Sequence, residues 1–338
     1  MFTVVVPSSE RPETLPTALR SIARQTARAA VAAVVIERSA DEASAAGAID
    51  DLPVHFAGGG AARDALTQRA ALLKKAQSFQ QPYIAILHED AWWGPDHLAN
   101  ALGELQRNAE TRAYWTTAFC VHGERSWVAM CWSISCWVAS GFKPLGEVVT
   151  FDAERSALAA YASAPLHQSG VVAQADALID AFSASARWPT LVDNDRLLFL
   201  ELARGGAQRI RLVPEIFVRH VAKDRWFFSP EGTADDVRIA TQAALDFCRE
   251  HGVDAVCALE RLADECPFPA WRNCLHEIID PAALEFLRAR NALPFYKPYT
   301  EPRNAKWLAR QACPPLLWGL AQSLRENMRG TRGSIPRA

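Results

Sequence analysis

The chain has 338 residues, of which 50% are hydrophobic and 22% charged, a composition typical of a soluble globular protein rather than a disordered one. Its 36 basic and 38 acidic side chains leave a formal charge of −2, so no overall positive field favours binding to nucleic acid. No apolar run approaches the roughly 18 residues of a membrane-spanning helix, and the cysteines include no Cys-x-x-Cys pair. The N-terminus lacks the basic and apolar regions of a signal peptide, so we expect a cytoplasmic protein.

Strand and helix patterns alternate along the first hundred residues. Helices are predicted at 13–26, at 61–77 and from Pro95, and short β-branched runs predict strands at 2–6, 33–36, 54–56 and 83–87. This alternation is typical of a parallel sheet with right-handed crossovers, whose ligands bind outside the carboxyl ends of the strands. The polar or charged segments at those ends are 7–11, 37–41 and 88–93.

The predicted secondary structure changes twice in the rest of the chain. Residues 112–150 place four tryptophans among β-forming residues and predict strands, and residues 170–220 return to mixed α/β. From about 226 onward the pattern is helical, so we place a boundary near residue 225, between an α/β domain at 1–225 and a helical region at 226–338. Residues 303–338 carry seven basic residues against one acidic residue. They predict a solvated, partly disordered tail or, as the alternative, a contact with anionic membrane lipid or a partner.

Four motifs in the first hundred residues follow one another in a fixed order. They are Pro-Ser-Ser-Glu-Arg-Pro after the first strand, Glu-Arg-Ser at 37–39, Ala-Ala-Arg-Asp at 61–64, and Tyr-Ile-Ala-Ile-Leu-His-Glu-Asp-Ala-Trp-Trp-Gly-Pro-Asp-His-Leu at 83–98. A further block, Asn-Asp-Arg-Leu-Leu-Phe-Leu-Glu-Leu, starts at residue 194, and a Leu-Val-Pro segment follows it. Over about residues 1–220 this set resembles the family 2 glycosyltransferases of the GT-A fold. The resemblance implies a Rossmann-like, mostly parallel sheet flanked by helices.

The resemblance also implies a reaction, in which a sugar moves with inversion from a nucleoside-diphosphate sugar, UDP-sugars being favoured, to an acceptor hydroxyl. Asp195 takes the position of the catalytic base that the hydroxyl needs, with Asp193 as the second choice and a helix N-cap as the structural alternative. Asp90, together with His88, takes the position of ligands to a divalent cation that neutralises the leaving diphosphate. Mn²⁺ is favoured over Mg²⁺, because imidazole binds Mg²⁺ poorly, and metal independence is the alternative.

The remaining candidate residues are implied to bind the nucleotide sugar. Glu37 stands where the family has an acid that contacts the nucleotide base, and Arg63 has donors suited to a diphosphate. Trp93 belongs to the Trp-Trp pair after the metal motif and would stack on a sugar, with core packing as the alternative. The full set of these candidates is Pro7, Ser8, Ser9, Arg11, Glu37, Arg63, Glu89 and Trp93.

Three departures from the family pattern open a second interpretation. His88 replaces the first metal carboxylate, Ser-Glu-Arg at 9–11 stands where an asparagine is usual, and Glu-Arg-Ser at 37–39 is shorter than the usual motif. These changes allow a non-catalytic GT-A-fold module that binds a nucleotide sugar, a glycan or a protein partner. A nucleotidyltransferase and a dinucleotide-binding dehydrogenase are disfavoured, because no glycine-rich loop follows the first strand.

The sequence leaves the acceptor open. A surface polysaccharide, a lipid-linked sugar, a protein side chain and a natural product all remain candidates, and the resemblance favours polysaccharide or glycoconjugate synthesis. The helical region could complete the acceptor site, dock a partner or form a homodimer, and peripheral membrane contact through the basic tail is the alternative to a solvated tail.

Overall fold

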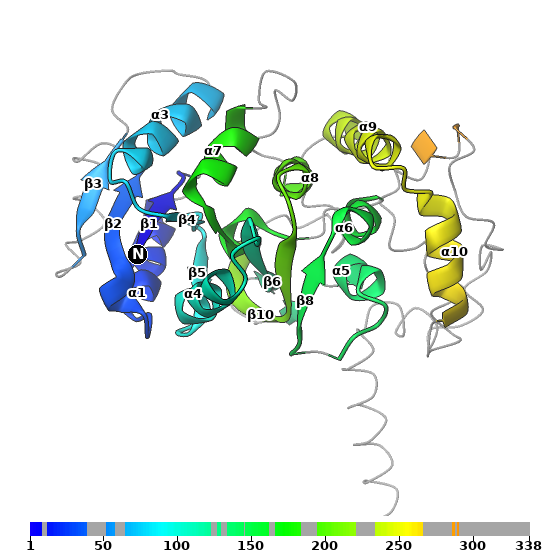
Figure 1. Cartoon of the computed structure of the whole chain (residues 1–338). Helices are drawn as coiled ribbons and strands as arrows, with labels where there is room; N and C mark the ends of the chain where they lie inside the picture. The colour runs from blue at the N-terminus through cyan, green and yellow to red at the C-terminus, as the bar shows by residue number, and fades with distance from the viewer. Residues whose placement is uncertain are drawn as a thin grey trace, which may run out of the picture. The chain divides into compact units, whose positions relative to one another are not determined.

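The computed structural model describes residues 1–8, 12–38, 52–57, 65–122, 127–129, 134–144, 146–161, 166–183, 195–220, 234–265, 286–287 and 289–290 (Figure 1). All of them belong to one compact unit, Met1–Tyr296, and the second unit, Lys297–Ala338, lies outside the described residues together with the basic tail. Within the described ranges, no helix combines the length and the apolar character needed to cross a bilayer.

A ten-stranded mixed sheet runs through this unit. Its main path has the order β3-β2-β1-β4-β9-β6-β10-β5, with β7 beside β6 and β8 beside β10. Pairing is parallel from β3 to β4 and between β6 and β10, whereas β9 lies antiparallel between β4 and β6. The predicted α/β class and the parallel N-terminal sheet are therefore confirmed. The strands are β1 (Phe2–Val6), β2 (Val31–Ile36), β3 (Val54–Phe56), β4 (Tyr83–Ile86), β5 (Ala91–Trp93), β6 (Ala113–His122), β7 (Trp127–Ala129), β8 (Val148–Phe151), β9 (Val171–Gln174) and β10 (Gln208–His220).

Helices pack on both faces of the sheet, because successive side chains of its buried strands point to opposite sides. In β1, Val4 and Val6 join one buried cluster with residues of α1 and α4, while Val5 joins the other with residues of α3 and α7. The helices are α1 (Leu15–Ala23), α3 (Ala65–Gln77), α4 (His97–Arg107), α5 (Ile134–Ala139), α6 (Ala153–Ala160), α7 (Ala175–Ser183), α8 (Asp195–Arg204), α9 (Ala234–Glu250) and α10 (Ala255–Glu265), and the short 3₁₀ helices are η1 (Pro12–Thr14), η2 (Arg28–Ala30) and η3 (Gln168–Gly170).

One predicted stretch of strand is wrong. Strands are predicted within the tryptophan-rich region 112–150, but residues 134–139 form helix α5. Cys136, Val138 and Ala139 of this short helix are all buried in the core. Trp137 lies between Cys136 and Val138, and its indole donates to the Lys143 carbonyl oxygen at 3.0 Å, just beyond the helix end.

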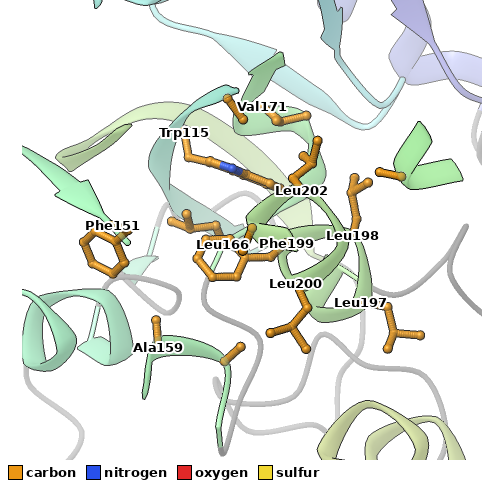
Figure 2. Close-up of a cluster of buried hydrophobic side chains, with 14 of the residues drawn as sticks. Trp115, Phe151, Ala159, Leu166, Val171, Leu197, Leu198, Phe199, Leu200 and Leu202 are labelled. Atoms are coloured by element: carbon orange, nitrogen blue, oxygen red, sulfur yellow. The ribbon is translucent and has the colours of Figure 1, made fainter. Parts of the chain in front are cut away.

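Helix α8 lies in the middle of the larger core cluster (Figure 2). Leu197, Leu198, Phe199 and Leu200 are all at most 1% exposed, so the helix is apolar on every side, as expected for one surrounded by other elements. The ring of Phe199 packs against Trp115 of β6 with 5.5 Å between ring centroids. Asp195 is the first residue of this helix, and its position is therefore set by the core.

The helical segment that follows the predicted boundary shares this core. Val237, Ala240, Ala244 and Phe247 of α9 are at most 2% exposed and belong to the same buried cluster as α8. The predicted helical character after residue 226 is confirmed for α9 and α10, whereas the division into domains at residue 225 stays a prediction.

Candidate active site

The ends of β1, β2 and β4 lie next to one another, as the parallel order requires. The Glu37 amide donates to the Val6 carbonyl oxygen at 3.0 Å, and the Glu89 amide donates to the Pro7 carbonyl oxygen at 3.4 Å. Three segments that are far apart in the sequence are thus joined by backbone hydrogen bonds at one edge of the sheet. The structure brings together Pro7, Ser8, Glu37, His88, Glu89 and Asp90.

Glu37 is bound by donors from two neighbouring elements. The Ser8 amide donates to Glu37 Oε2 at 3.0 Å, and Arg69 Nε of helix α3 lies 3.8 Å from the same oxygen. Glu37 is 8% exposed and the Arg69 side chain only 4%. These contacts fix the Glu37 carboxylate at the carboxyl edge of the sheet. They also place the buried Arg69 guanidinium beside it, a neighbour that the sequence did not predict.

Arg38 and Glu89 form a two-point ion pair between the ends of β2 and β4. Arg38 Nε donates to Glu89 Oε2 at 2.8 Å and Nη2 donates to Oε1 at 2.7 Å, the parallel geometry for which guanidinium and carboxylate are suited. The Glu89 side chain has no exposed surface. Both of its oxygens are bound by Arg38, and its contact with the nucleotide sugar stays a prediction. The sequence held a signal for this pair, since an arginine and a glutamate follow the ends of the two strands that flank β1.

The short helix η3 connects the end of β4 with the start of α8. Ser169 Oγ accepts a hydrogen bond from the His88 amide at 3.0 Å, and the Gln168 amide donates to Asp195 Oδ1 at 2.9 Å. Asp195 is 9% exposed. The expected base and the expected diphosphate-binding segment, which are over a hundred residues apart in the sequence, are thus held by two consecutive residues. Sequence reasoning missed η3 entirely.

Gly170 explains why η3 can lie so close to the sheet. A Cβ atom at this position would lie 2.7 Å from the carbonyl oxygen of Thr116 in β6, too close for any side chain. The missing side chain lets the backbone of η3 approach β6, after which Val171 starts strand β9. A glycine after His-Gln-Ser was the only local signal in the sequence for this approach.

Two histidines face each other beside Asp90. The rings of His88 and His167 meet edge to face with 5.5 Å between centroids. Burial, and then the charge of Arg69, lower the pKa of His88 well below its usual range. Burial lowers the pKa of His167 to about 4, although the charge of Asp90 opposes that shift. Both imidazoles are therefore neutral at pH 7.

Few described side chains at this edge could bind a metal ion. No group of three or more His, Cys, Asp or Glu side chains capable of holding a metal occurs among the residues that the structure describes. The positive charge of Arg69 acts on His88, which disfavours a dication at that ring, and Glu89 is bound by Arg38. Asp90 is partly exposed and is the one predicted ligand that fits a hard cation shared with a diphosphate.

Trp93 packs in the core, as the alternative interpretation of this residue expects, and its contact with a sugar stays a prediction. It is 3% exposed, and its indole N–H donates to the Ser169 carbonyl oxygen at 2.6 Å. Its neighbour Trp92 points to the other face of β5 and is partly exposed. Trp92 stacks on Phe217 of β10 at 5.5 Å with 8° between the rings, and Phe217 stacks in turn on Phe119 of β6. This aromatic row begins two residues after Asp90.

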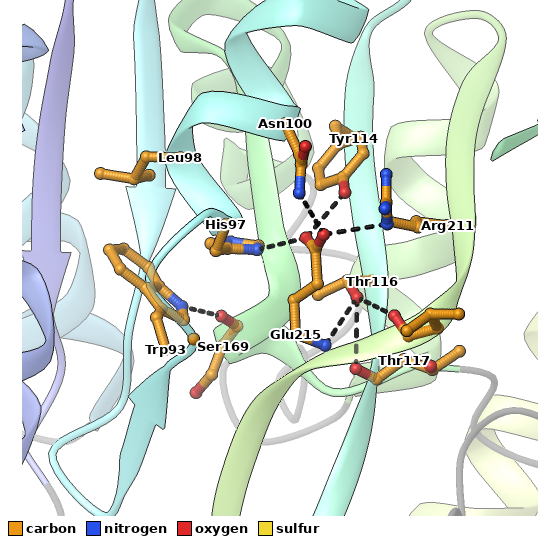
Figure 3. Close-up of polar contacts among 12 residues, drawn as sticks. Trp93, His97, Leu98, Asn100, Tyr114, Thr116, Thr117, Ser169, Arg211 and Glu215 are labelled. Carbon is orange, nitrogen blue, oxygen red and sulfur yellow. Dashed lines mark hydrogen bonds and ion pairs between the residues drawn. The ribbon is translucent and has the colours of Figure 1, made fainter. Parts of the chain in front are cut away.

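Glu215 anchors the strands behind Trp93 (Figure 3). Its carboxylate accepts hydrogen bonds from Asn100 of α4 at 2.5 Å and from the Tyr114 hydroxyl at 2.8 Å, and Arg211 Nε lies 3.0 Å away. His97 Nδ1 is 3.3 Å from the second carboxylate oxygen. Burial raises the pKa of Tyr114 above its ordinary value, so the hydroxyl stays a donor. This network ties α4 to β10 and supports the packing around Trp93.

Several predicted residues fall outside the description. Ser9, Arg11, Arg63 and the second-choice base Asp193 lie outside the described residues. Their roles stay predictions.

Comparison with known proteins gives a likeness in structure only. No family model and no curated protein sequence matches the chain. S. aureus TarS 1–349 in complex with UDP-GlcNAc has 14% identity and a TM-score of 0.45, covering 87% of this chain and 93% of that one. The same part of TarS in complex with UDP has 13% identity and a TM-score of 0.44, covering 85% and 89%. Full TarS has 13% identity and a TM-score of 0.43, covering 86% and 54%. Similarity of this extent concerns the arrangement of elements and assigns no activity to this chain.

Proposed function

We propose that the chain is an inverting glycosyltransferase that moves a sugar from a nucleoside-diphosphate sugar to an acceptor hydroxyl. The observation that carries the proposal is the joining of the β4 end and Asp195 by η3, through the hydrogen bonds of Ser169 and Gln168. Transfer needs a base for the acceptor beside the site of the leaving diphosphate, and these two segments supply the candidates for both tasks.

Asp195 acts as the base in this mechanism. The Gln168 amide donates to one of its oxygens, which favours the charged carboxylate and fixes its direction. The carboxylate takes the proton of the acceptor hydroxyl as the oxygen attacks the anomeric carbon on the face opposite the nucleotide. Positive charge develops at that carbon in an oxocarbenium-like transition state, as in glycoside hydrolysis.

The donor is held at the carboxyl edge of the sheet. Glu37, which accepts from the Ser8 amide, would also accept from an imide N–H of the nucleotide base, as uracil offers. Asp90 would hold Mn²⁺ or Mg²⁺ together with the diphosphate, and that cation would neutralise the leaving group.

A non-catalytic binding module is the second candidate, and one observation favours it. The ion pair with Arg38 removes Glu89 from the accessible surface, so one of the three residues at the metal motif serves the scaffold. A protein that only binds a nucleotide sugar or a glycan would tolerate such a loss.

The anomer of the product tests the proposal. We would incubate the protein with UDP-GlcNAc, the ligand of one of the similar structures, and follow slow transfer of the sugar to water by proton NMR. An inverting enzyme releases the β anomer first, before mutarotation, and Asp195→Asn abolishes the signal. Release of the α anomer, or turnover that Asp195→Asn leaves intact, would contradict the mechanism. Binding of UDP-GlcNAc without any turnover, also in the presence of oligosaccharide acceptors, would favour the binding module.

A further inference from the structure

A buried arginine links the first turn of α8 to the C-terminal helix α9. Arg196 and Thr241 have no exposed surface. Arg196 Nη1 donates to Thr241 Oγ1 at 2.9 Å, and the Thr241 hydroxyl donates in turn to the Val237 carbonyl oxygen at 2.7 Å within α9. Two residues that are 45 positions apart are thus joined inside the core.

The same guanidinium closes the end of helix α6. Arg196 Nε donates to the carbonyl oxygen of Ala160, the last residue of α6, and Nη2 donates to that of Tyr161. Carbonyl groups at a helix C-terminus have no partner within the helix and carry the negative end of its dipole, so they suit a buried cation. A buried charge is costly unless every donor direction is used, and the planar guanidinium can satisfy these acceptors in one orientation only. The position of Arg196 is therefore fixed by α6 and α9 together.

Asp195 is the residue immediately before Arg196. Its carboxylate must keep one direction to accept from the Gln168 amide, and the first turn of α8 must keep its place for this to happen. The three acceptors of Arg196 supply that restraint, because a rotation of the first turn would break them.

We propose that Arg196 is a positioning residue for Asp195 and that Thr241 makes helix α9 part of the frame of the site. The meaning for catalysis rests on the proposed function, but the restraint itself is independent of it. Helix α9 of the C-terminal helical region would then help to hold Asp195 in place through its buried contact with Arg196, whichever acceptor the enzyme uses.

The test uses the full chain and the substitution Thr241→Val, which keeps the shape of the side chain and removes the acceptor. Thr3→Val is the matched control, since Thr3 is fully buried in β1 and its hydroxyl has no hydrogen-bond partner among the described residues. Hydrogen exchange of the Gln168 amide, read by mass spectrometry on the peptide around 166–174, reports whether Asp195 keeps its direction. We expect about fivefold faster exchange there in Thr241→Val, as for the loss of one hydrogen bond, and no change in Thr3→Val or in Thr241→Ser.

Helix α7 serves as the internal reference for this experiment. Unchanged exchange at Gln168, or an equal increase over Ala175–Ser183 that shows a general loss of stability, would overturn the proposal. Where the wild type turns over UDP-GlcNAc, Thr241→Val should lower kcat about tenfold and leave the Kd of UDP unchanged, because only the base is displaced. Loss of UDP affinity with kcat preserved would also overturn it. A wild type without turnover would refute the proposed function alone, and the exchange result would still decide this inference.

Discussion

At the scale of single residues, Asp195 is the side chain on which the proposed reaction depends. Its Oδ1 accepts from the Gln168 amide, and an asparagine at this position keeps that acceptor while removing the basic carboxylate. We therefore expect Asp195→Asn to lower the rate of UDP release at least about 100-fold and to leave UDP binding unchanged. Steady-state kinetics and calorimetric titration measure the two quantities.

The control for this variant is Asp176→Asn. Asp176 lies in the first turn of α7 and its side chain is 71% exposed, so its substitution should change neither quantity. Equal activity of the Asp195 variant and the wild type would show that another residue acts as the base.

The pair of Arg38 and Glu89 gives a prediction on stability. Glu89→Gln removes the negative charge and leaves the guanidinium, whose side chain is 12% exposed, without its two-point partner. We expect the free energy of unfolding to fall by roughly 2 kcal/mol, less than for a fully buried pair because water still reaches Arg38. Urea denaturation followed by circular dichroism measures it.

An exposed ion pair provides the comparison for Glu89→Gln. Asp235 and Arg238 are 3.1 Å apart with side chains 82% and 45% exposed, and such pairs contribute little. Asp235→Asn should leave the urea midpoint unchanged. A loss no greater in Glu89→Gln than in Asp235→Asn would contradict the structural role given to the Arg38 pair.

The aromatic residues after Asp90 show what the sequence could and could not predict at this scale. The sequence identifies both tryptophans as candidates, and the alternation of a strand decides between them. Trp93 shares a face with Ala91, which is buried, while Trp92 points the other way.

At the scale of elements, η3 is the part of the site that the sequence did not predict. The strands of the parallel half were predictable, because β-branched runs and their spacing are local signals. The hydrogen bonds of η3 join residues 81 and 27 positions apart, and nothing in the local pattern around His167 indicates them. The position of β9 between β4 and β6 could not be predicted for the same reason, since the pairing of strands depends on packing across the whole fold.

Gly170 gives the prediction that tests η3. In Gly170→Ala the new Cβ would lie 2.7 Å from the Thr116 carbonyl oxygen, so η3 must move away from β6. We expect a loss of about 1–3 kcal/mol in the free energy of unfolding and a lower rate of UDP release, since Ser169 and Gln168 move with it. Urea denaturation and steady-state kinetics measure the two effects.

Gly103→Ala is the matched control on helix α4. There the new Cβ would meet only the flexible end of Arg107, and alanine is favoured over glycine within a helix. This variant should be as stable as the wild type or more so. A Gly170→Ala protein with wild-type stability and activity would show that the close approach of η3 is not needed.

At the scale of the whole molecule, α9 decides whether residues 1–225 can fold alone. Its buried side chains share the core of α8, and Thr241 accepts from Arg196. A fragment of residues 1–225 would expose that core and leave one Arg196 donor without its acceptor. We expect it to show no cooperative urea transition, whereas a chain of residues 1–296, which covers the whole compact unit, should unfold cooperatively. A cooperative transition of the shorter fragment at the wild-type midpoint would support a domain boundary at residue 225.

Thermal unfolding of the full chain with UDP tests whether the carboxyl edge of β1, β2 and β4 binds a nucleoside diphosphate. At 100 times its Kd, UDP should stabilise the protein by about 2.7 kcal/mol and raise the Tm clearly. Repeating the measurement with Mn²⁺, with Mg²⁺ and with EDTA shows whether Asp90 holds a cation there, and Asp90→Ala should remove any dependence on the metal. We expect UDP to raise the Tm. Unchanged Tm values with UDP, GDP, dTDP and CMP, with and without metal, would contradict it.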